Sequence, residues 1–311
     1  MSAPYRLALV GIDGSGKTTA IAHLRRRLGS EGEVVTVHSP SFHENPNAPL
    51  RQLSRQMREV SLVADEIGSF ALKVAMLYLQ MTLYGAVERA MVEAFRPRCV
   101  ISDRHALVDT LAYGTVYKGL DPEPHDRATL EPLLRRRLAS PASLDATIAW
   151  QQRLERRRGG ESDFWNLALD LDRAFDAGPA EVLAEFGRRY STSPPDAVVL
   201  LDVDPLETMR RAATREGASS ELHEDPAILE ALRGMYEHAL DLLSEHCDGI
   251  AVHRLDAGGL AVEETVEALV GFLPGEVRDA CALQPPGTKT ESSSARRPGR
   301  GRLSSKEAVT R

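Results

Sequence analysis

The feature that most constrains this chain is a glycine-rich segment that lies between an apolar stretch and a helical pattern. Residues 11–18 read Gly-Ile-Asp-Gly-Ser-Gly-Lys-Thr and fit GxxxxGK[ST] at every fixed position. Residues 6–12 predict a buried parallel strand, and residues 17–28 predict a helix that ends at Gly29. A strand, a loop of this pattern and a helix form a phosphate-binding loop (P-loop). The segment therefore predicts a nucleoside triphosphate site.

Each residue type in this loop serves phosphate binding. Glycines let backbone N–H groups turn inward around a phosphate at the positive end of the following helix. Lys17 supplies a point charge to the β and γ phosphates, and the hydroxyl of Thr18 is a ligand for Mg²⁺. The alternative is a chance glycine-rich turn, which the strand and helix in register with the motif disfavour.

Further apolar runs predict the rest of the sheet. Strand patterns occur at residues 34–38, 98–102, 197–203 and 250–255, and helical spacing fills roughly residues 50–95 and 262–272. Strands that alternate with helices predict an α/β protein with a parallel sheet. With the P-loop, this is the three-layer P-loop NTPase fold: a five-stranded parallel sheet flanked by helices.

Two regions lack this alternation of strands and helices. No strand pattern occurs between residues 121 and 194, which predicts a helical insertion with arginine runs at 135–137 and 156–158. From about residue 284 the chain is basic and nearly free of apolar residues, so residues 284–311 are expected to be a disordered tail. We expect one P-loop domain over residues 1–283.

Composition excludes several other classes of protein. The net charge is −7, from 38 Lys and Arg against 45 Asp and Glu, which argues against general nucleic-acid binding. The longest apolar stretch, residues 70–87, carries Lys73 and Gln80 and predicts a buried helix rather than a membrane span. The first residues lack a secretory pattern, and the three cysteines lack metal-ligand spacing. A cytoplasmic protein is expected.

A second candidate motif follows the third predicted strand, at Asp103-Arg104-His105. A carboxylate beside the P-loop strand can hold Mg²⁺ water or orient an attacking oxygen. The neighbouring guanidinium can clamp a second phosphate through its fork of donors. The alternatives are a helix N-cap for Asp103 and a surface ion pair for Arg104, and the residues alone do not decide between these readings.

With these two motifs, the sequence resembles the thymidylate kinase family over residues 6–120 and 195–272. The family's GxDGxGKTT matches residues 11–19, and its Asp-Arg-Tyr/His signature matches residues 103–105, with Ala112-Tyr113 after it. A fourth-strand motif of the form PDLTLLLDVPPE matches residues 195–205. The arginine-rich helix and lid resemble the segment with Arg210, Arg211 and Arg215, and Leu255-Asp256-Ala257 resembles a late loop near adenine.

The resemblance implies a role for each matching residue. Lys17, Asp103, Arg104 and the lid residue Arg215 are the expected catalytic residues, with Thr18 and Asp103 near Mg²⁺. Arg104 would hold the acceptor phosphate, and Asp13 would face the acceptor. The residues expected to bind ATP are Gly11, Asp13, Gly14, Ser15, Gly16, Lys17, Thr18, Thr19, Arg211 and Asp256. Those expected to bind the acceptor are Asp13, Tyr78, Arg104 and Tyr113.

The acceptor pocket departs from the family pattern. Counting back from Asp103, the family's base-stacking Phe falls on Tyr78, which can stack or can be a core aromatic residue. The family's base-reading Arg falls on Thr82, and its Thr-Arg-Glu-Pro after the second strand is replaced by His38-Ser39-Pro40. The arginine runs of the insertion are either solvated helix faces or part of a cap over a bulkier or more anionic acceptor.

These observations lead to three hypotheses. The first is ATP- and Mg²⁺-dependent phosphoryl transfer to a nucleoside monophosphate, with dTMP converted to dTDP as the default. The second is a kinase of a modified nucleotide, another nucleoside or a specialised metabolite on the same fold. The third is a non-catalytic ATP-binding interaction module, which has no need of an acceptor clamp such as Arg104. The resemblance also implies a homodimer, with residues 70–87 either at its interface or in the core.

Overall fold

A five-stranded parallel sheet forms the centre of the protein. The computed structural model describes residues 3–29, 33–118, 127–213 and 226–282. The strand order is β2-β3-β1-β4-β5, and every pair is parallel. The strands are β1 (Tyr5–Val10), β2 (Val34–His38), β3 (Cys99–Asp103), β4 (Ala197–Asp202) and β5 (Ala251–Asp256). The three central strands are almost wholly buried, as expected for a sheet that is covered on both faces.

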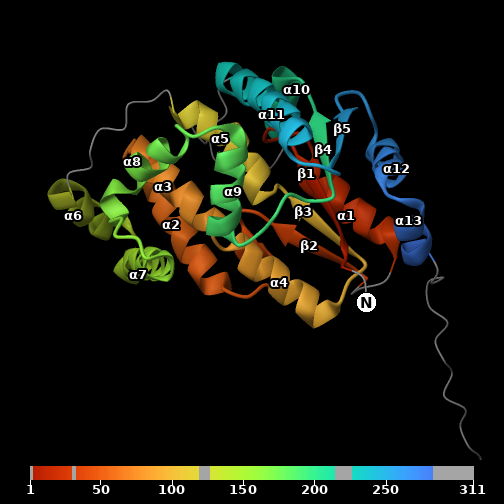
Figure 1. The fold of residues 1–311 in the computed structure, drawn as a ribbon. Helices are drawn as coiled ribbons and strands as arrows, with labels where there is room; N and C mark the ends of the chain where they lie inside the picture. The colour runs from red at the N-terminus through yellow and green to blue at the C-terminus, as the bar shows by residue number, and fades with distance from the viewer. Residues whose placement is uncertain (1–2, 30–32, 119–126, 214–225, 283–311) are drawn as a thin grey trace, which may run out of the picture.

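Helices cover both faces and make three layers (Figure 1). On one face, apolar side chains of the sheet pack with α1, α12 and α13. On the other face, a larger core joins the sheet to the remaining helices, among them α2–α5, α9 and α11. The helix bounds are as follows: α1 Lys17–Leu28, α2 Arg51–Glu66, α3 Phe70–Met81, α4 Tyr84–Phe95, α5 Ala106–Lys118, α10 Pro205–Ala213, α11 Pro226–His246, α12 Val262–Phe272 and α13 Gly275–Ala282. The predicted P-loop NTPase fold is confirmed.

The described part of the region predicted as an insertion is mainly helical and contains no strand. It contains α6 (Arg127–Arg137), α7 (Pro141–Arg158), α8 (Leu167–Ala174) and α9 (Pro179–Tyr190), with a 3-10 turn η2 (Phe164–Asn166) before α8. Helices α6 and α7 lie beyond α2 and α3, away from the sheet, whereas α9 lies nearer the sheet (Figure 1). Residues 214–225, which include Arg215, and the tail at 284–311 lie outside the described residues.

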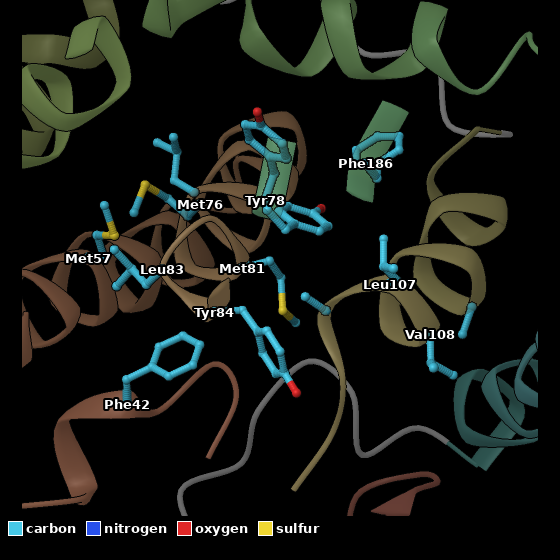
Figure 2. Close-up of a cluster of buried hydrophobic side chains, with 14 of the residues drawn as sticks. Phe42, Met57, Met76, Tyr78, Met81, Leu83, Tyr84, Leu107, Val108 and Phe186 are labelled. Atoms are coloured by element: carbon cyan, nitrogen blue, oxygen red, sulfur yellow. The ribbon is translucent and has the colours of Figure 1, made fainter. Parts of the chain in front are cut away.

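The apolar stretch at residues 70–87 is two helices rather than the single helix we expected. Helix α3 ends at Met81 and α4 begins at Tyr84, and the Thr82 hydroxyl donates to the carbonyl oxygen of Leu79 at the break. Together residues 70–95 are long and apolar enough to cross a membrane, but 72% of the most apolar window is buried inside the protein. Figure 2 shows how side chains of α2, α3, α4, α5, α9 and the 3-10 turn η1 (Phe42–Glu44) meet in this core.

The topology determines where the site lies. The P-loop follows β1, whose neighbours in the sheet are β3 on one side and β4 on the other. The order of the strands therefore reverses at β1. In open parallel sheets, ligands bind at such a switch point, outside the carboxyl ends of the strands. Asp103 is in register with Leu9 of β1 and with His38 of β2, so the end of β3 lies level with the start of the P-loop.

Candidate functional site

The P-loop has no room for a side chain at two of its glycines. Gly11 and Gly14 have φ of 140° and 82°, in the left-handed region. A Cβ atom on Gly11 would lie 2.7 Å from the carbonyl oxygen of Leu201, and one on Gly14 would lie 2.9 Å from Thr208. Since neither neighbour is the end of a flexible side chain, the glycines are required for the loop to pack against β4 and α10.

Lys17 places the positive charge of the loop at its centre. Its Nζ donates to the carbonyl oxygens of Gly11 and Ile12 at 2.9 and 2.8 Å and to Ser15 Oγ at 3.3 Å. Burial and the nearby charge of Arg104 lower the pKa of Lys17 to about 8. The ammonium group is therefore held in a buried loop where an anionic phosphate would restore its ordinary pKa.

Thr18 and Asp103 bring two side-chain oxygen atoms together, at the start of α1 and the end of β3. Thr18 Oγ1 donates to Asp103 Oδ2 at 2.6 Å, and His38 Nδ1 lies 3.7 Å from the same oxygen. Although burial raises the pKa of Asp103, the nearby His38, the hydrogen bond from Thr18 and the charge of Lys17 keep it below its usual value. A carboxylate that is ionised beside a hydroxyl fits Mg²⁺, which binds few protein oxygens and completes its shell with water and phosphate.

Arg104 is the centre of a buried network. It forms an ion pair with Asp13, and its Nη1 donates to Tyr113 OH at 3.0 Å and to Tyr236 OH at 2.6 Å. Tyr236 OH in turn donates to Asp109 Oδ1 at 2.9 Å, and Asp109 Oδ2 lies 3.9 Å from Arg104. Burial raises the pKa of Asp109 to about 6, even though Arg104 and Tyr236 lower it. These contacts hold the guanidinium in one orientation, directly beside the P-loop residue Asp13.

One cavity of about 590 Å³ connects these groups. It begins at the P-loop and the ends of β2 and β3 and extends between α2, α3, α5, α8 and α9. The site residues that line it are Asp13, Gly14, Gly16, Lys17, Thr18, Thr19, Tyr78, Asp103, Arg104 and Tyr113. Thus one continuous space joins the predicted phosphate site to all four residues predicted for the acceptor.

The far wall of the cavity is aromatic, and the insertion contributes much of it. Leu171 and Phe175 from the α8 region and Phe186 and Tyr190 from α9 all line the space. Phe186 and Tyr190 pack against Tyr78, with ring centroids 6.2 and 5.8 Å away. Phe175 also fills the space beside the backbone at Gly114 on α5. The insertion therefore forms a wall of the site as well as an outer layer.

Two arginines of the insertion hold Tyr78. Arg158 Nη1 donates to Tyr78 OH at 2.9 Å, and the Arg189 guanidinium lies 5.8 Å from the Tyr78 ring centroid. Arg158 belongs to the run at 156–158, so this run has one member that touches the cavity wall. Arg135, from the run at 135–137, instead pairs with carboxylates of α6 and α7.

Thr82, the position of the family's base-reading arginine, does not line the cavity. Its Oγ1 accepts a hydrogen bond from Trp150 Nε1 of α7 at 2.8 Å and donates to Leu79 O at 2.5 Å. The polar residues of α3 that line the cavity are Lys73 and Gln80. Sequence reasoning missed Gln80 as a site residue, although its position inside an apolar helix was a signal.

Arg211 lies beside the P-loop and Asp256 at the end of β5, and neither residue lines the cavity. Arg211 Nη2 donates to the carbonyl oxygens of Ala257 and Gly258 at 3.2 and 2.9 Å, and Nη1 lies 4.0 Å from the point that a Cβ on Gly16 would occupy. Asp256 Oδ1 accepts from the backbone N–H of Gly258 at 3.1 Å. Arg211 thus links the loop after β5 to the end of the P-loop.

A protein-family model agrees with the resemblance over part of the chain. Residues 9–129 match the thymidylate kinase family model. No curated protein matches the chain. Two solved structures of deoxyadenosine kinase from M. mycoides are similar: one, with the products dCMP and dCDP, at 16% identity and a TM-score of 0.44, and one, with dATP, at 15% and 0.43. Each alignment covers 86% of this chain and 97% of the other.

Proposed function

We propose, from the premise that residues 9–129 match the thymidylate kinase family, that this protein transfers the γ-phosphoryl group of ATP to a nucleoside monophosphate. The observation that carries the proposal is the single cavity that joins Lys17 and the P-loop to Arg104 and on to an aromatic wall. A protein that only binds ATP has no need of a cavity that continues beyond the phosphate site to a buried guanidinium.

In this proposal the P-loop and Lys17 bind the ATP phosphates, and Thr18 and Asp103 hold Mg²⁺. When bound, the ion would neutralise charge on the β and γ phosphates. Arg104 would bind the acceptor phosphate, and Asp13 would face the acceptor from the P-loop side. Because phosphoryl transfer depends chiefly on positioning and charge, the rigid network around Arg104 would contribute by holding the acceptor in line.

The ATP side of the site would be completed from α10 and the segment after it. Arg211 would lie against adenine, together with Asp256 at the end of β5. Arg215, outside the described residues, is the proposed source of the cation that stabilises the transferred group. Closure of this segment over ATP would also exclude water and limit hydrolysis.

We propose dTMP as the acceptor to test first. The aromatic wall at Tyr78, Phe186 and Tyr190 can pack against a base while Arg104 holds the phosphate. A nucleoside is the second candidate, because Arg104 already pairs with Asp13 and Lys73 with Asp65, and His38-Ser39-Pro40 adds no arginine. A homodimer and a cytoplasmic location are further parts of the proposal.

An ADP-release assay with ATP and Mg²⁺ tests the proposed function. The acceptors are dTMP, dUMP, UMP, CMP, AMP, GMP and thymidine, with a reaction lacking acceptor as the blank and Lys17→Met as the inactive control. We expect release to be stimulated by dTMP above the blank. Stimulation by thymidine alone would favour the nucleoside kinase, and the absence of stimulation in every reaction, with ATP still bound, would favour the non-catalytic module.

A further inference from the structure

One face of α3 lines the cavity. Its cavity-lining residues recur three or four positions apart, as expected for one side of a helix: Lys73, Val74, Leu77, Tyr78, Gln80 and Met81. Most are apolar or aromatic, and the polar members are Lys73 and Gln80. Any hydrogen bond from this face to a bound molecule must therefore come from Lys73, Gln80 or the Tyr78 hydroxyl.

Of these three polar groups, two already have protein partners. Lys73 forms an ion pair with Asp65 of α2. The Tyr78 hydroxyl accepts a hydrogen bond from Arg158 of the insertion. Both groups are therefore held by charged side chains, and neither offers its full hydrogen-bonding capacity to a ligand.

Gln80 is different. Its side chain is buried, with only 3% of the residue exposed, yet within the described part of the chain its amide makes no hydrogen bond. Gln80 also lines the cavity, where a bound molecule could meet it. An amide held out of bulk water without a partner is costly unless a ligand supplies the missing hydrogen bonds.

We propose that Gln80 reads the hydrogen-bonding edge of the acceptor's base, and that the site accepts pyrimidines with either a 4-keto or a 4-amino group. This inference rests on the proposed function and defines its acceptor class. The Gln80 amide carries a donor and an acceptor side by side, which match the adjacent polar groups on the edge of a base.

The breadth of the expected specificity follows from the chemistry of the amide. An arginine only donates, so an arginine in this position would pair with a keto oxygen and leave an amino group without a partner. The described protein groups form no hydrogen bond that fixes one orientation of the Gln80 amide. Rotation by 180° lets it donate to the 4-keto oxygen of thymine or accept from the 4-amino group of cytosine. Thr82, held by Trp150, takes no part.

The test compares three acceptors on the full chain: dTMP, dCMP and the deoxynucleotide of 2-pyrimidinone, which lacks a 4-substituent. With the wild-type protein we expect kcat/KM for dTMP and dCMP to agree within tenfold and to exceed that of the third acceptor at least tenfold. Gln80→Met keeps the length of the side chain and removes both hydrogen bonds. It should reduce this discrimination to less than threefold while the KM for ATP stays within twofold.

Thr82→Val is the matched control, since it changes a polar residue directly after α3 that does not line the cavity. It should leave the ratios among the three acceptors unchanged. Calorimetry with the same three nucleotides gives their Kd ratios without turnover. Absence of turnover with every acceptor therefore refutes the proposed function alone. If Gln80→Met leaves the Kd ratios unchanged, the proposed role of Gln80 is wrong. If the wild-type protein phosphorylates dTMP but not dCMP, the proposal that the amide binds in two orientations is wrong.

Discussion

Replacement of Tyr236 by Phe removes the hydroxyl group that joins Arg104 to Asp109. This hydroxyl accepts from Arg104 Nη1 at 2.6 Å and donates to Asp109 Oδ1 at 2.9 Å, and all three side chains are buried. A hydrogen bond to a charged group contributes about 1.5–3 kcal/mol, and Tyr113 remains as a partner of Nη1. We therefore expect Tyr236→Phe to lower the free energy of unfolding by about 3 kcal/mol at pH 8.

The loss should depend on pH because Asp109 titrates in the folded protein. Burial raises its pKa from 3.8 to about 6, so the stability that this group contributes falls as pH rises from about 4 to 6. The hydrogen bond from Tyr236 lowers that pKa, so its removal raises the pKa further, at about 1.4 kcal/mol per pH unit. The difference between the variant and the wild type should therefore widen as pH rises through 6 and be smaller at pH 5 than at pH 8.

Urea unfolding at pH 5 and pH 8 measures this difference. The slope m of the two proteins is compared to establish that both expose the same amount of surface on unfolding. Tyr190→Phe is the matched control. It is an equally buried tyrosine, and its hydroxyl lies 2.7 Å from the neutral hydroxyl of Thr110. It should lose about 1 kcal/mol at both pH values. A loss below about 1 kcal/mol for Tyr236→Phe at pH 8, or an equal loss at the two pH values, would refute the reasoning.

Three further predictions concern the site. Because the pKa of Lys17 is lowered to about 8, titration calorimetry of the ligand-free protein should show ATP affinity falling as pH rises above 8, and Lys17→Met should abolish both binding and this pH dependence. Arg158→Ala should raise the KM for the acceptor about three- to tenfold by releasing Tyr78, with the KM for ATP unchanged in the same assay; an equal rise in both would argue against a local role. Thr82→Val should lower the free energy of unfolding by about 1 kcal/mol, measured with urea, through loss of its bond to Trp150, and a selective change of acceptor KM would contradict our assignment.

Much of the fold follows from local patterns in the sequence. Four of the five strands are apolar runs with mostly buried residues, and β5 at the edge of the sheet is partly exposed. The predicted bounds of all five differ from the observed ones by two residues or fewer. The P-loop is equally local, since its glycines, Lys17 and Thr18 lie within a few residues of one another. Asp103 could be placed near it because the carboxyl ends of neighbouring parallel strands meet at one edge of the sheet.

The acceptor side could not be derived in this way because its contacts join distant parts of the chain. Thr82 meets Trp150 across 68 residues, and Tyr78 meets Arg158 across 80. The counting that placed Thr82 at the site also assumed one continuous helix, whereas α3 ends at Met81. Which face of α3 turns to the cavity depends on the packing of the insertion, and periodicity alone does not determine it.

The most direct test of the central claim is to follow the γ-phosphoryl group itself. The protein is incubated with γ-labelled ATP, Mg²⁺ and dTMP, and the labelled products are separated, with Lys17→Met and a reaction without dTMP as controls. Our account predicts that the label appears in dTDP and that neither control produces it. Label found only in inorganic phosphate, at the same rate with and without dTMP, would contradict transfer to this acceptor and leave an ATP-hydrolysing or ATP-binding role.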